Sequence, residues 1–394
     1  MLSLLIDDVQ LWDGTGSPSQ SRTSVEVRDG SIHWIGSASE WRGNRATIRV
    51  VDGRARTLIP GLMDCHVHYS GPGGPEWIAR FTDPLPEISM RAVELAESSL
   101  RSGVTTARDV GAPQGVSIKL AHKARAGEIH APNIRAAGTW IAHRGTYVPF
   151  ARHFGEPAEL REAIRAEIEA GADLIKVALA GWNEGARPKD AQDIPFDAKL
   201  LAMAVEEAHK AGFKIACHAN DPFSCRIAAN SGVDSLEHGM FLEPVDLEAM
   251  AKNKTYLVPT MSVWDAMLYY SRAVEWPEAR RKRAEDLRNG SRDAVNGAIR
   301  AGVPIALGTD AGGGAARHGR IAREAELMVE AGMKPHDALL AATSSAARLI
   351  GEPERGTIEE GKIADLVLLD SNPLENIGGL RLIAAVFQGG QRVA

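Results

Sequence analysis

Apolar and polar stretches alternate regularly along the chain from about residue 57 to residue 351. Each unit has a short apolar or β-branched run, a polar loop, and then a stretch with apolar residues at helical spacing, such as Leu160, Ile164 and Ile168. A residue suited to end a helix in a left-handed conformation closes most units. We expect these helix ends at Gly103, Gly127, Gly171, Gly212, Gly232, Asn253 and Gly302.

The apolar runs between these helices predict eight strands. They cover residues 58–68, 104–109, 133–143, 174–178, 214–218, 234–238, 255–260 and 303–309. Almost continuously apolar strands that alternate with helices are typical of an α/β fold with a closed parallel (β/α)8 barrel, the TIM barrel. A doubly wound open sheet is the alternative, but the glycine-rich phosphate turn expected after its first strand is missing here.

The two ends of the chain have a different pattern, with short alternating runs separated by turns. Residues 24–35 predict a hairpin around Asp29 and Gly30, and residues 356–370 and 380–393 predict further strands. We expect both ends to meet in one small β-sandwich. The predicted organisation is a composite β-sandwich domain of residues 1–56 and 355–394, and a catalytic barrel of residues 57–354.

Composition restricts the possible partners and location. The 394 residues are 44% hydrophobic and 24% charged, as in an ordinary globular protein, and the net charge of −6 argues against binding nucleic acid. We expect no signal peptide and no membrane association, because the start lacks a cationic segment and no apolar run approaches the ~20 residues of a membrane span. The three cysteines have no CxxC spacing. This favours a reducing compartment, and we expect a cytoplasmic protein.

Ligand-type side chains stand at the ends of five predicted strands. His66 and His68 have the i, i+2 spacing that points both imidazoles to one face of a strand. The other strand ends carry Lys176, His218, His238 and Asp310. Because the carboxyl ends of barrel strands meet on one face, we expect all six side chains to surround a single pocket.

This set of side chains is suited to metal ions. Imidazole and carboxylate ligands suit Zn2+ or Mn2+, and four histidines with one aspartate exceed what a single tetrahedral ion uses. We therefore expect two divalent ions, with Zn2+ as the first choice. A protonated amine cannot bind a cation, but a desolvated Lys176 could take up CO2 and become a carbamate that bridges both ions.

Three longer motifs resemble the amidohydrolase superfamily, and the match extends over essentially the whole chain. They are residues 60–68, 308–312 and 361–368. Residues 104–111 and 172–176 resemble in particular the branch that contains imidazolonepropionases, prolidase-like dipeptidases and metal-dependent carboxypeptidases. The resemblance implies that His66, His68 and Asp310 hold one metal and that His218 and His238 hold the other. It also implies that Lys176 is carboxylated and bridges the two.

The implied activity is hydrolysis of a C–N bond in a small amide, such as a dipeptide, an N-acyl amino acid or a carbamate. A hydroxide that bridges the metals would attack the carbonyl, and Asp310 would act as general base and then as acid. Most relatives associate, so a homo-oligomer is expected. A deaminase or cyclic amidase on the same barrel is the alternative, although residues 218–222 lack the glutamate a deaminase needs. A binding protein without activity should have lost a ligand, and all six are present.

Loop residues are the candidates for substrate contact. Relatives carry a histidine in a Gly-Gly-His-Gly segment at the end of strand three, and His143 occupies that place here within Ile-Ala-His-Arg-Gly. We expect a catalytic role for His143 and substrate contacts from Arg144, Asn220 and Tyr69. Several dipeptidase relatives have a tyrosine or histidine where this chain has Asn220. This difference and the altered glycine segment favour a substrate other than a plain dipeptide.

For five further residues the sequence permits two interpretations each. Arg108 and Asp109 form either an internal ion pair or a substrate clamp. Trp182 and Trp264 either line the pocket or pack loops. His318, in the glycine-rich loop of residues 311–319, is expected to be exposed to solvent, and a place on a mobile lid is the alternative.

Overall fold

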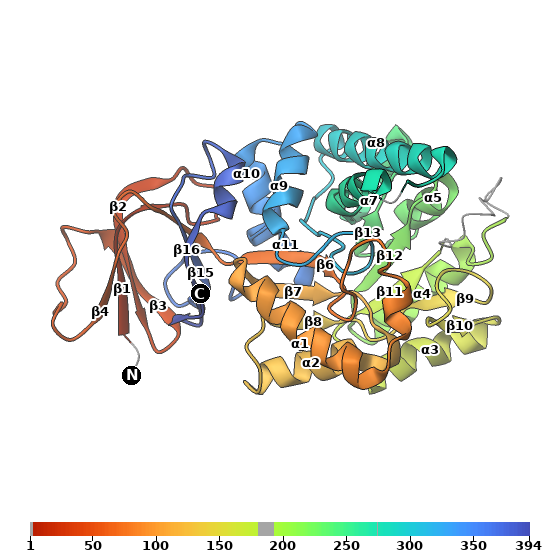
Figure 1. Cartoon of the computed structure of the whole chain (residues 1–394), viewed down its shortest axis with the longest axis horizontal. Coiled ribbons are helices and arrows are strands. Elements are labelled where there is room, and N and C mark those ends of the chain that lie inside the picture. Colours follow the sequence, from red (N-terminus) through yellow and green to blue (C-terminus); the bar gives the residue numbers. More distant parts are fainter. Residues whose placement is uncertain (1–2, 180–192, 274) are drawn as a thin grey trace.

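The computed structural model describes residues 3–179, 193–273 and 275–394. Its elements separate into a sheet built from both ends of the chain and a barrel built from the residues between them (Figure 1). Trp182 lies outside the described residues.

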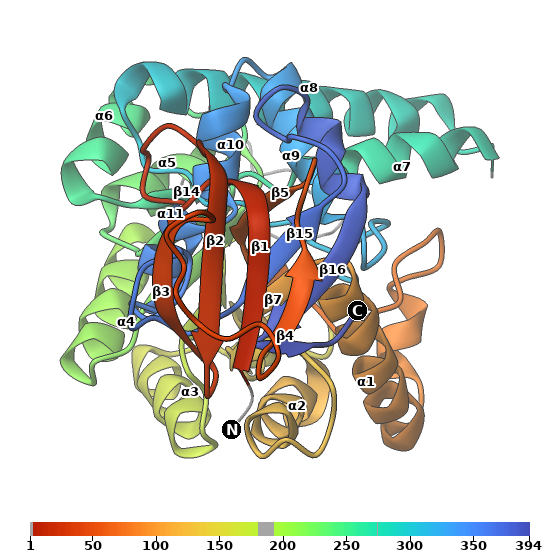
Figure 2. The same ribbon diagram turned by 90° about the vertical axis from the view of Figure 1, so that its left-hand side faces the viewer.

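Strands from both chain ends form the terminal sheet. Its order is β17-β16-β15-β5-β1-β2-β3, with β4 paired to β1 (Figure 2). The strands are β1 Ser3–Leu11, β2 Gln20–Arg28, β3 Ser31–Ser37, β4 Arg49–Asp52, β5 Thr57–Pro60, β15 Leu366–Leu369, β16 Ile383–Gln388 and β17 Gln391–Arg392. The predicted hairpin is present, since Arg28 pairs with Ser31 and leaves Asp29 and Gly30 as a two-residue turn with φ of 47° and 86°.

Strand β1 changes partner along its length. Its first half pairs with β4 and its end pairs with β5, and the pairing register shifts near Asp8, which has φ 59°. Apolar side chains from both chain ends share one buried cluster, including Ile6, Val25, Leu366 and Phe387. The two ends therefore stabilise each other.

The domain boundaries expected at residues 56/57 and 354/355 remain a proposal. Backbone pairing in the terminal sheet extends to Pro60, which lies beyond the first of them.

The barrel strands form two parallel sheets, β6-β7-β8 and β10-β9-β11-β12-β13-β14. Their bounds are β6 Leu62–Val67, β7 Val104–Asp109, β8 Asn133–Ala136, β9 Ile141–His143, β10 Arg152–Phe154, β11 Ile175–Ala178, β12 Ile215–Ala219, β13 Ser235–His238 and β14 Tyr256–Val258. The strand predicted over residues 133–143 is two strands, β8 and β9. The chain turns between them at Gly138, which has φ 76° and where an added Cβ would lie 2.2 Å from the Glu167 carboxylate.

The eighth predicted strand, residues 303–309, is extended but pairs irregularly. It makes one bridge, between Ile305 and Leu257. The N–H of Leu307 donates to Ala341 instead of to a neighbouring strand, and this interrupts the ladder. The segment still closes the barrel, because the N–H of Cys65 donates to the Leu307 carbonyl at 2.8 Å.

Helices cover the outside of the barrel (Figure 1). They are α1 Leu85–Arg101, α2 Val116–Arg125, α3 Pro157–Glu169, α4 Ala198–Lys210, α5 Pro222–Asn230, α6 Pro244–Asn253, α7 Met261–Ala273, α8 Glu278–Ala301, α9 Ile321–Glu330, α10 Pro335–Ala341 and α11 Ser344–Ile350, with short 3-10 turns at Ala79–Thr82, Pro113–Gly115 and Ile377–Arg381. The six predicted glycine helix ends all have positive φ. Asn253 was predicted wrongly, because it is the last residue of α6 and Lys254 takes the left-handed position at φ 58°.

The architecture is the predicted α/β fold, a (β/α)8 barrel with a small β-sandwich formed by both termini. None of the helices in the described ranges is both long enough and apolar enough to cross a bilayer.

Candidate metal centre at the carboxyl ends of the barrel strands

The barrel brings six ligand-type side chains to the carboxyl ends of its strands. They are His66 on β6, His68 directly after it, Lys176 on β11, His218 on β12, His238 on β13, and Asp310 after the closing segment. All six are buried. Residues separated by up to 244 positions in the sequence therefore lie at one end of the barrel, as expected where parallel strands end together.

Short distances connect five of these side chains. The Nε2 atoms of His66 and His68 each lie 3.4 Å from Oδ1 of Asp310. Nδ1 of His218 lies 2.8 Å from Nε2 of His238. Ligand atoms of His66, His238 and Asp310 all lie within 4.8 Å of one another. The donor atoms thus converge from different strands, which is the arrangement a divalent cation needs.

The outer nitrogens of three of these imidazoles have acceptors. Nδ1 of His66 is 2.6 Å from Glu237 Oε2, Nδ1 of His68 is 2.7 Å from the Gly111 carbonyl, and Nδ1 of His238 is 2.7 Å from Thr260 Oγ1. A proton held on Nδ1 leaves the Nε2 lone pair free. The contacts therefore leave Nε2 of His66 and His68 facing Asp310, whereas Nε2 of His238 lies 2.8 Å from Nδ1 of His218. All three imidazoles are candidate metal ligands.

Lys176 has a buried amine without a partner in the described ranges. Its Nζ is fully buried and makes no hydrogen bond there, and the same is true of Nε2 of His218. Burial lowers the pKa of Lys176 to about 8, against the opposing effect of the Glu237 carboxylate. A buried amine with a lowered pKa is suited to react with CO2, and its lack of a partner is compatible with a role in holding an ion, because most buried polar atoms in proteins have a hydrogen-bond partner.

Glu237 joins the metal centre to a buried ion pair that the sequence did not predict. Its Oε1 accepts a hydrogen bond from Arg108 at 2.7 Å and another from Ser235 at 2.5 Å. Arg108 therefore pairs with Glu237, and the Arg108–Asp109 ion pair is wrong. Asp109 instead accepts hydrogen bonds from the N–H groups of Tyr69 and Gly111, and burial raises the pKa of its carboxyl to about 6.

His143 and Arg144 contact other parts of the molecule. The His143 ring packs edge-on against Phe154 at 5.3 Å. Arg144 is exposed and forms an ion pair with Glu159 on α3 at 2.6 Å. In the described part of the chain, neither residue has a hydrogen bond or ring contact with the six candidate ligands.

Asn220 and Tyr69 are both buried, in different surroundings. Asn220 lines a small cavity of about 50 Å³ together with Trp264 on α7, whose ring lies 6.1 Å from that of His238. Tyr69 stacks on His318 at 5.0 Å. The expectation of a solvent-exposed His318 is wrong. It is buried, and its Nε2 lies 3.2 Å from the carbonyls of His68 and Gly71, so it holds its loop against β6.

Tyr147 is a residue near the metal centre that the sequence analysis missed. Its ring lies 4.9 Å from the ring of His218. Burial and the nearby charge of Asp310 both raise the pKa of its phenol, so it stays neutral. A tyrosine in a polar loop has no periodicity or motif that distinguishes it. Its position four residues after His143, at the end of a barrel strand, is the one feature that could have made it a candidate site residue.

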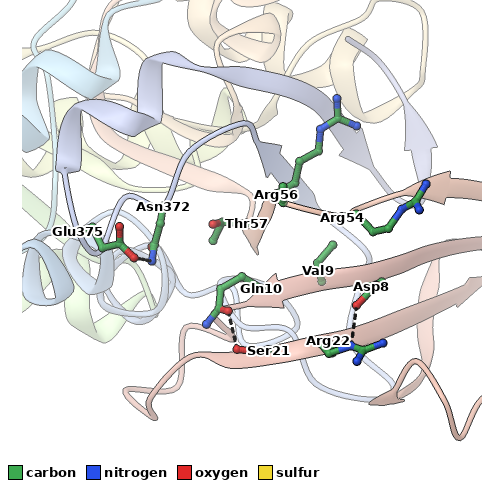
Figure 3. Close-up of a pocket in the computed structure, with 11 residues that line it drawn as sticks. Asp8, Val9, Gln10, Ser21, Arg22, Arg54, Arg56, Thr57, Asn372 and Glu375 are labelled. Carbon is green, nitrogen blue, oxygen red and sulfur yellow. Dashed lines mark hydrogen bonds and ion pairs between the residues drawn. The ribbon is translucent and has the colours of Figure 1, made fainter.

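A larger cavity, of about 460 Å³, lies in the terminal sheet (Figure 3). Its lining includes arginines, but each is paired with a carboxylate: Arg22 with Asp8, Arg54 with Asp52 and Arg56 with Asp370. None of its lining residues is a candidate site residue. The metal centre in the barrel therefore remains the candidate functional site.

Enzymes with this fold hold their active sites at the carboxyl ends of the barrel strands, where this chain places its buried imidazole, carboxylate and amine groups. Fold and site together define the class of hydrolytic barrel enzymes. Comparison with known proteins gives the family. The chain belongs to the amidohydrolase family, whose model matches residues 57–393.

Individual relatives agree with this assignment. The ochratoxinase of Aspergillus niger is 29% identical over 96% of this chain and 84% of its own length. The imidazolonepropionase of Paracoccus denitrificans is 27% identical over 91% and 89%. A solved structure of a Xaa-Pro dipeptidase with methionine bound in its active site is 30% identical, covers 99% of both chains and has a TM-score of 0.88. The predicted branch is confirmed, and this protein is a hydrolytic enzyme that acts on C–N bonds.

Proposed function

We propose that this protein is a binuclear metal-dependent amidase that cleaves the bond between an acyl group and an amino-acid-like or aromatic amine. One observation carries the proposal. The Nζ of Lys176 is buried, interacts electrostatically with His66, His218, His238 and Asp310, and has no hydrogen-bond partner among the described residues. Carboxylation would turn this isolated amine into a carbamate with two oxygens, which is suited to bridge two cations.

The family resemblance and the position of these side chains support one assignment of ligands. In this proposal His66, His68 and Asp310 would hold one ion, and His218 and His238 would hold the other. Carboxylated Lys176 would bind both ions. When bound, Zn2+ or Mn2+ ions supply a water that ionises near neutral pH and a positive charge that polarises the substrate carbonyl.

Asp310 is the proposed proton carrier. Its N–H donates to the His66 carbonyl at 2.7 Å, and its Oδ1 faces His66 and His68, which together hold the carboxylate in position. Its other oxygen, Oδ2, would accept a proton from the attacking water and deliver it to the leaving nitrogen, as a general base and then a general acid.

The names of relatives and the surroundings of Asn220 support the proposed substrate class. Ochratoxinase and Xaa-Pro dipeptidase are the names of relatives that cover almost the whole chain. Beside Asn220 lie the apolar groups of Trp264, Met267 and Leu287, which would suit an apolar part of the substrate. N-acyl amino acids, dipeptides, carbamates and aryl amides are the candidate substrates. The predicted substrate contacts of Tyr69 and Arg144 and the catalytic role of His143 remain predictions.

Metal analysis combined with product identification tests this function. We expect about two equivalents of Zn2+ or Mn2+ per chain, and release of an amine together with a carboxylic acid. Full activity with one ion or none would contradict the binuclear site. Ammonia released from a ring amidine, or ring opening without a second product, would instead indicate a deaminase or a cyclic amidase. A deaminase would need a glutamate shortly after His218. The only carboxylate in residues 218–222 is that of Asp221, and it caps α5 by accepting hydrogen bonds from the N–H groups of Phe223 and Ser224.

We also propose a cytoplasmic location and a homo-oligomeric state. Cys65, Cys217 and Cys225 are buried free thiols, which supports a reducing compartment. Light scattering after size exclusion would measure the oligomeric state.

A further inference from the structure

Six aromatic rings form a closed circle at the carboxyl face of the barrel. In order they are His66, His68, Trp140, Tyr147, His218 and His238, and neighbouring ring centroids lie between 4.5 and 6.4 Å apart. Four members of this six-ring circle are candidate metal ligands. Trp140 and Tyr147 complete the circle. Each has one polar group, the indole N–H or the phenol hydroxyl, that could donate a hydrogen bond to a substrate.

The polar groups of these two residues have different surroundings. Nε1 of Trp140 packs beside Gly111, where an added Cβ would lie 2.7 Å from it, and this buried N–H has no hydrogen-bond partner in the described ranges. The hydroxyl of Tyr147 has no hydrogen bond to any residue in the described ranges, and it is close enough to Asp310 to be affected by its charge. Both residues therefore have a free donor, and Tyr147 is the one whose hydroxyl also feels the charge of Asp310, a candidate ligand of the metal centre.

The backbone of Tyr147 also resembles that of other residues of the site. Its φ is 59°, a left-handed value that a bulky side chain rarely adopts. His238, Thr260 and Asp310 share this feature, with φ of 71°, 49° and 52°. Such conformations persist where the surrounding structure imposes them, and they concentrate at functional sites.

We propose that Tyr147, rather than His143, donates a hydrogen bond to the oxygen of the scissile carbonyl as that oxygen becomes negatively charged. This inference rests on the proposed amide hydrolysis. Water adds to the carbonyl carbon, the C–N bond breaks, and Asp310 returns the proton to the leaving nitrogen, while the Tyr147 hydroxyl keeps its own proton. A hydrogen bond to an anionic oxygen is stronger than one to a neutral carbonyl, so its effect falls mainly on kcat.

Three variants test the inference. Tyr147→Phe removes the hydroxyl and keeps the ring, His143→Asn tests the residue expected from the sequence, and Tyr269→Phe is the matched control, because Tyr269 on α7 is 72% exposed. Each would be assayed for kcat and KM, for metal content, and for binding of an N-methylphosphonyl amino acid, whose tetrahedral anion mimics the transition state.

We expect Tyr147→Phe to lower kcat on the order of 100-fold or more, because oxyanion donors contribute 10²–10³. Phosphonate binding should weaken on the order of 10- to 100-fold, as for a lost hydrogen bond to a charged group. Metal content should stay at the wild-type level. Tyr269→Phe should behave like the wild type, and His143→Asn should lose far less activity than Tyr147→Phe.

The outcomes separate this inference from the proposed function. If the wild type hydrolyses amides and Tyr147→Phe retains its kcat and phosphonate binding, Tyr147 is not the donor and the proposed function stands. Loss of metal from Tyr147→Phe would also overturn the inference, because the residue would then support the metal site. A metal-loaded wild type that neither hydrolyses an amide nor binds the phosphonate would refute the proposed function and the donor role together.

Discussion

Breaking the buried ion pair between Arg108 and Glu237 should destabilise the protein strongly. Its charged atoms are 2.7 Å apart, and the two side chains are 3% and 0% exposed. At that distance two unit charges attract by about 6 kcal/mol with an effective dielectric constant of about 20, and removing one partner of a buried pair typically costs about 3–5 kcal/mol. This is a large fraction of the ~5–15 kcal/mol by which most domains are stable.

Urea unfolding of metal-free protein measures the effect. Arg108→Met and Glu237→Met should each lower the urea midpoint. The double variant should lose less stability than the two single variants lose together, because it leaves no uncompensated charge buried. Arg54→Met is the matched control. Its partner Asp52 is also 2.7 Å away, but the side chains are 75% and 58% exposed, so its midpoint should not move. Additive single effects, or single variants as stable as the control, would refute the reasoning.

Zinc retention distinguishes the role of Glu237 from that of Arg108. Glu237→Met removes the acceptor that holds the proton on Nδ1 of His66, and loss of such a partner typically weakens metal binding 10- to 100-fold, or about 1.4–2.7 kcal/mol. Arg108→Met leaves that acceptor in place and should retain more zinc during dialysis against a chelator. Equal zinc loss by both variants would mean that Glu237 does not orient His66.

Three further changes test other parts of the site. Lys176→Ala should lose one or both metals and nearly all activity, with partial rescue by short carboxylic acids, whereas unchanged metal content and rate would show that the lysine is only structural. Asp310→Asn should keep the fold, measured by circular dichroism, and lower kcat on the order of 100-fold or more, and a rate within a few-fold of the wild type would require a different base. Glu324 accepts hydrogen bonds from Met261 and Ser262 at the start of α7, but burial raises its pKa from 4.5 to about 7. The folded protein thus holds this proton more tightly than the unfolded chain, so the associated stability is present below pH 4.5 and falls as the pH rises to about 7, by about 3 kcal/mol. Glu324→Gln should therefore gain stability relative to the wild type between pH 5 and pH 8, and parallel pH profiles of the urea midpoint would contradict this.

Patterns within short segments were sufficient to predict the barrel and the six ligand-type residues. Strands buried on both faces show continuous apolar runs, and His66 and His68 share a face because side chains alternate along a strand. The parallel topology then requires His218 and His238 to end at the same face as His66, without any knowledge of the contacts between them.

The same alternation of side chains explains why the predicted ion pair between Arg108 and Asp109 is wrong. Arg108 and Asp109 are neighbours in sequence, so on β7 they point to opposite faces and cannot pair with each other. The partner of Arg108 is Glu237, which is 129 positions away and comes close only when β13 takes its place in the barrel. The sequence contains both residues but no local signal that joins them.

By itself, then, the sequence determined the fold class, most of the strands and the side chains at their ends, because these depend on periodicities that a single segment displays. The tertiary structure alone decided which of two loop residues approaches the metal centre. His143 ends β9 against Phe154, while the left-handed backbone at Tyr147 turns the next part of the loop so that its ring meets His218. That choice depends on packing between a loop and a strand far apart in sequence, and no repeat or spacing along the chain encodes it.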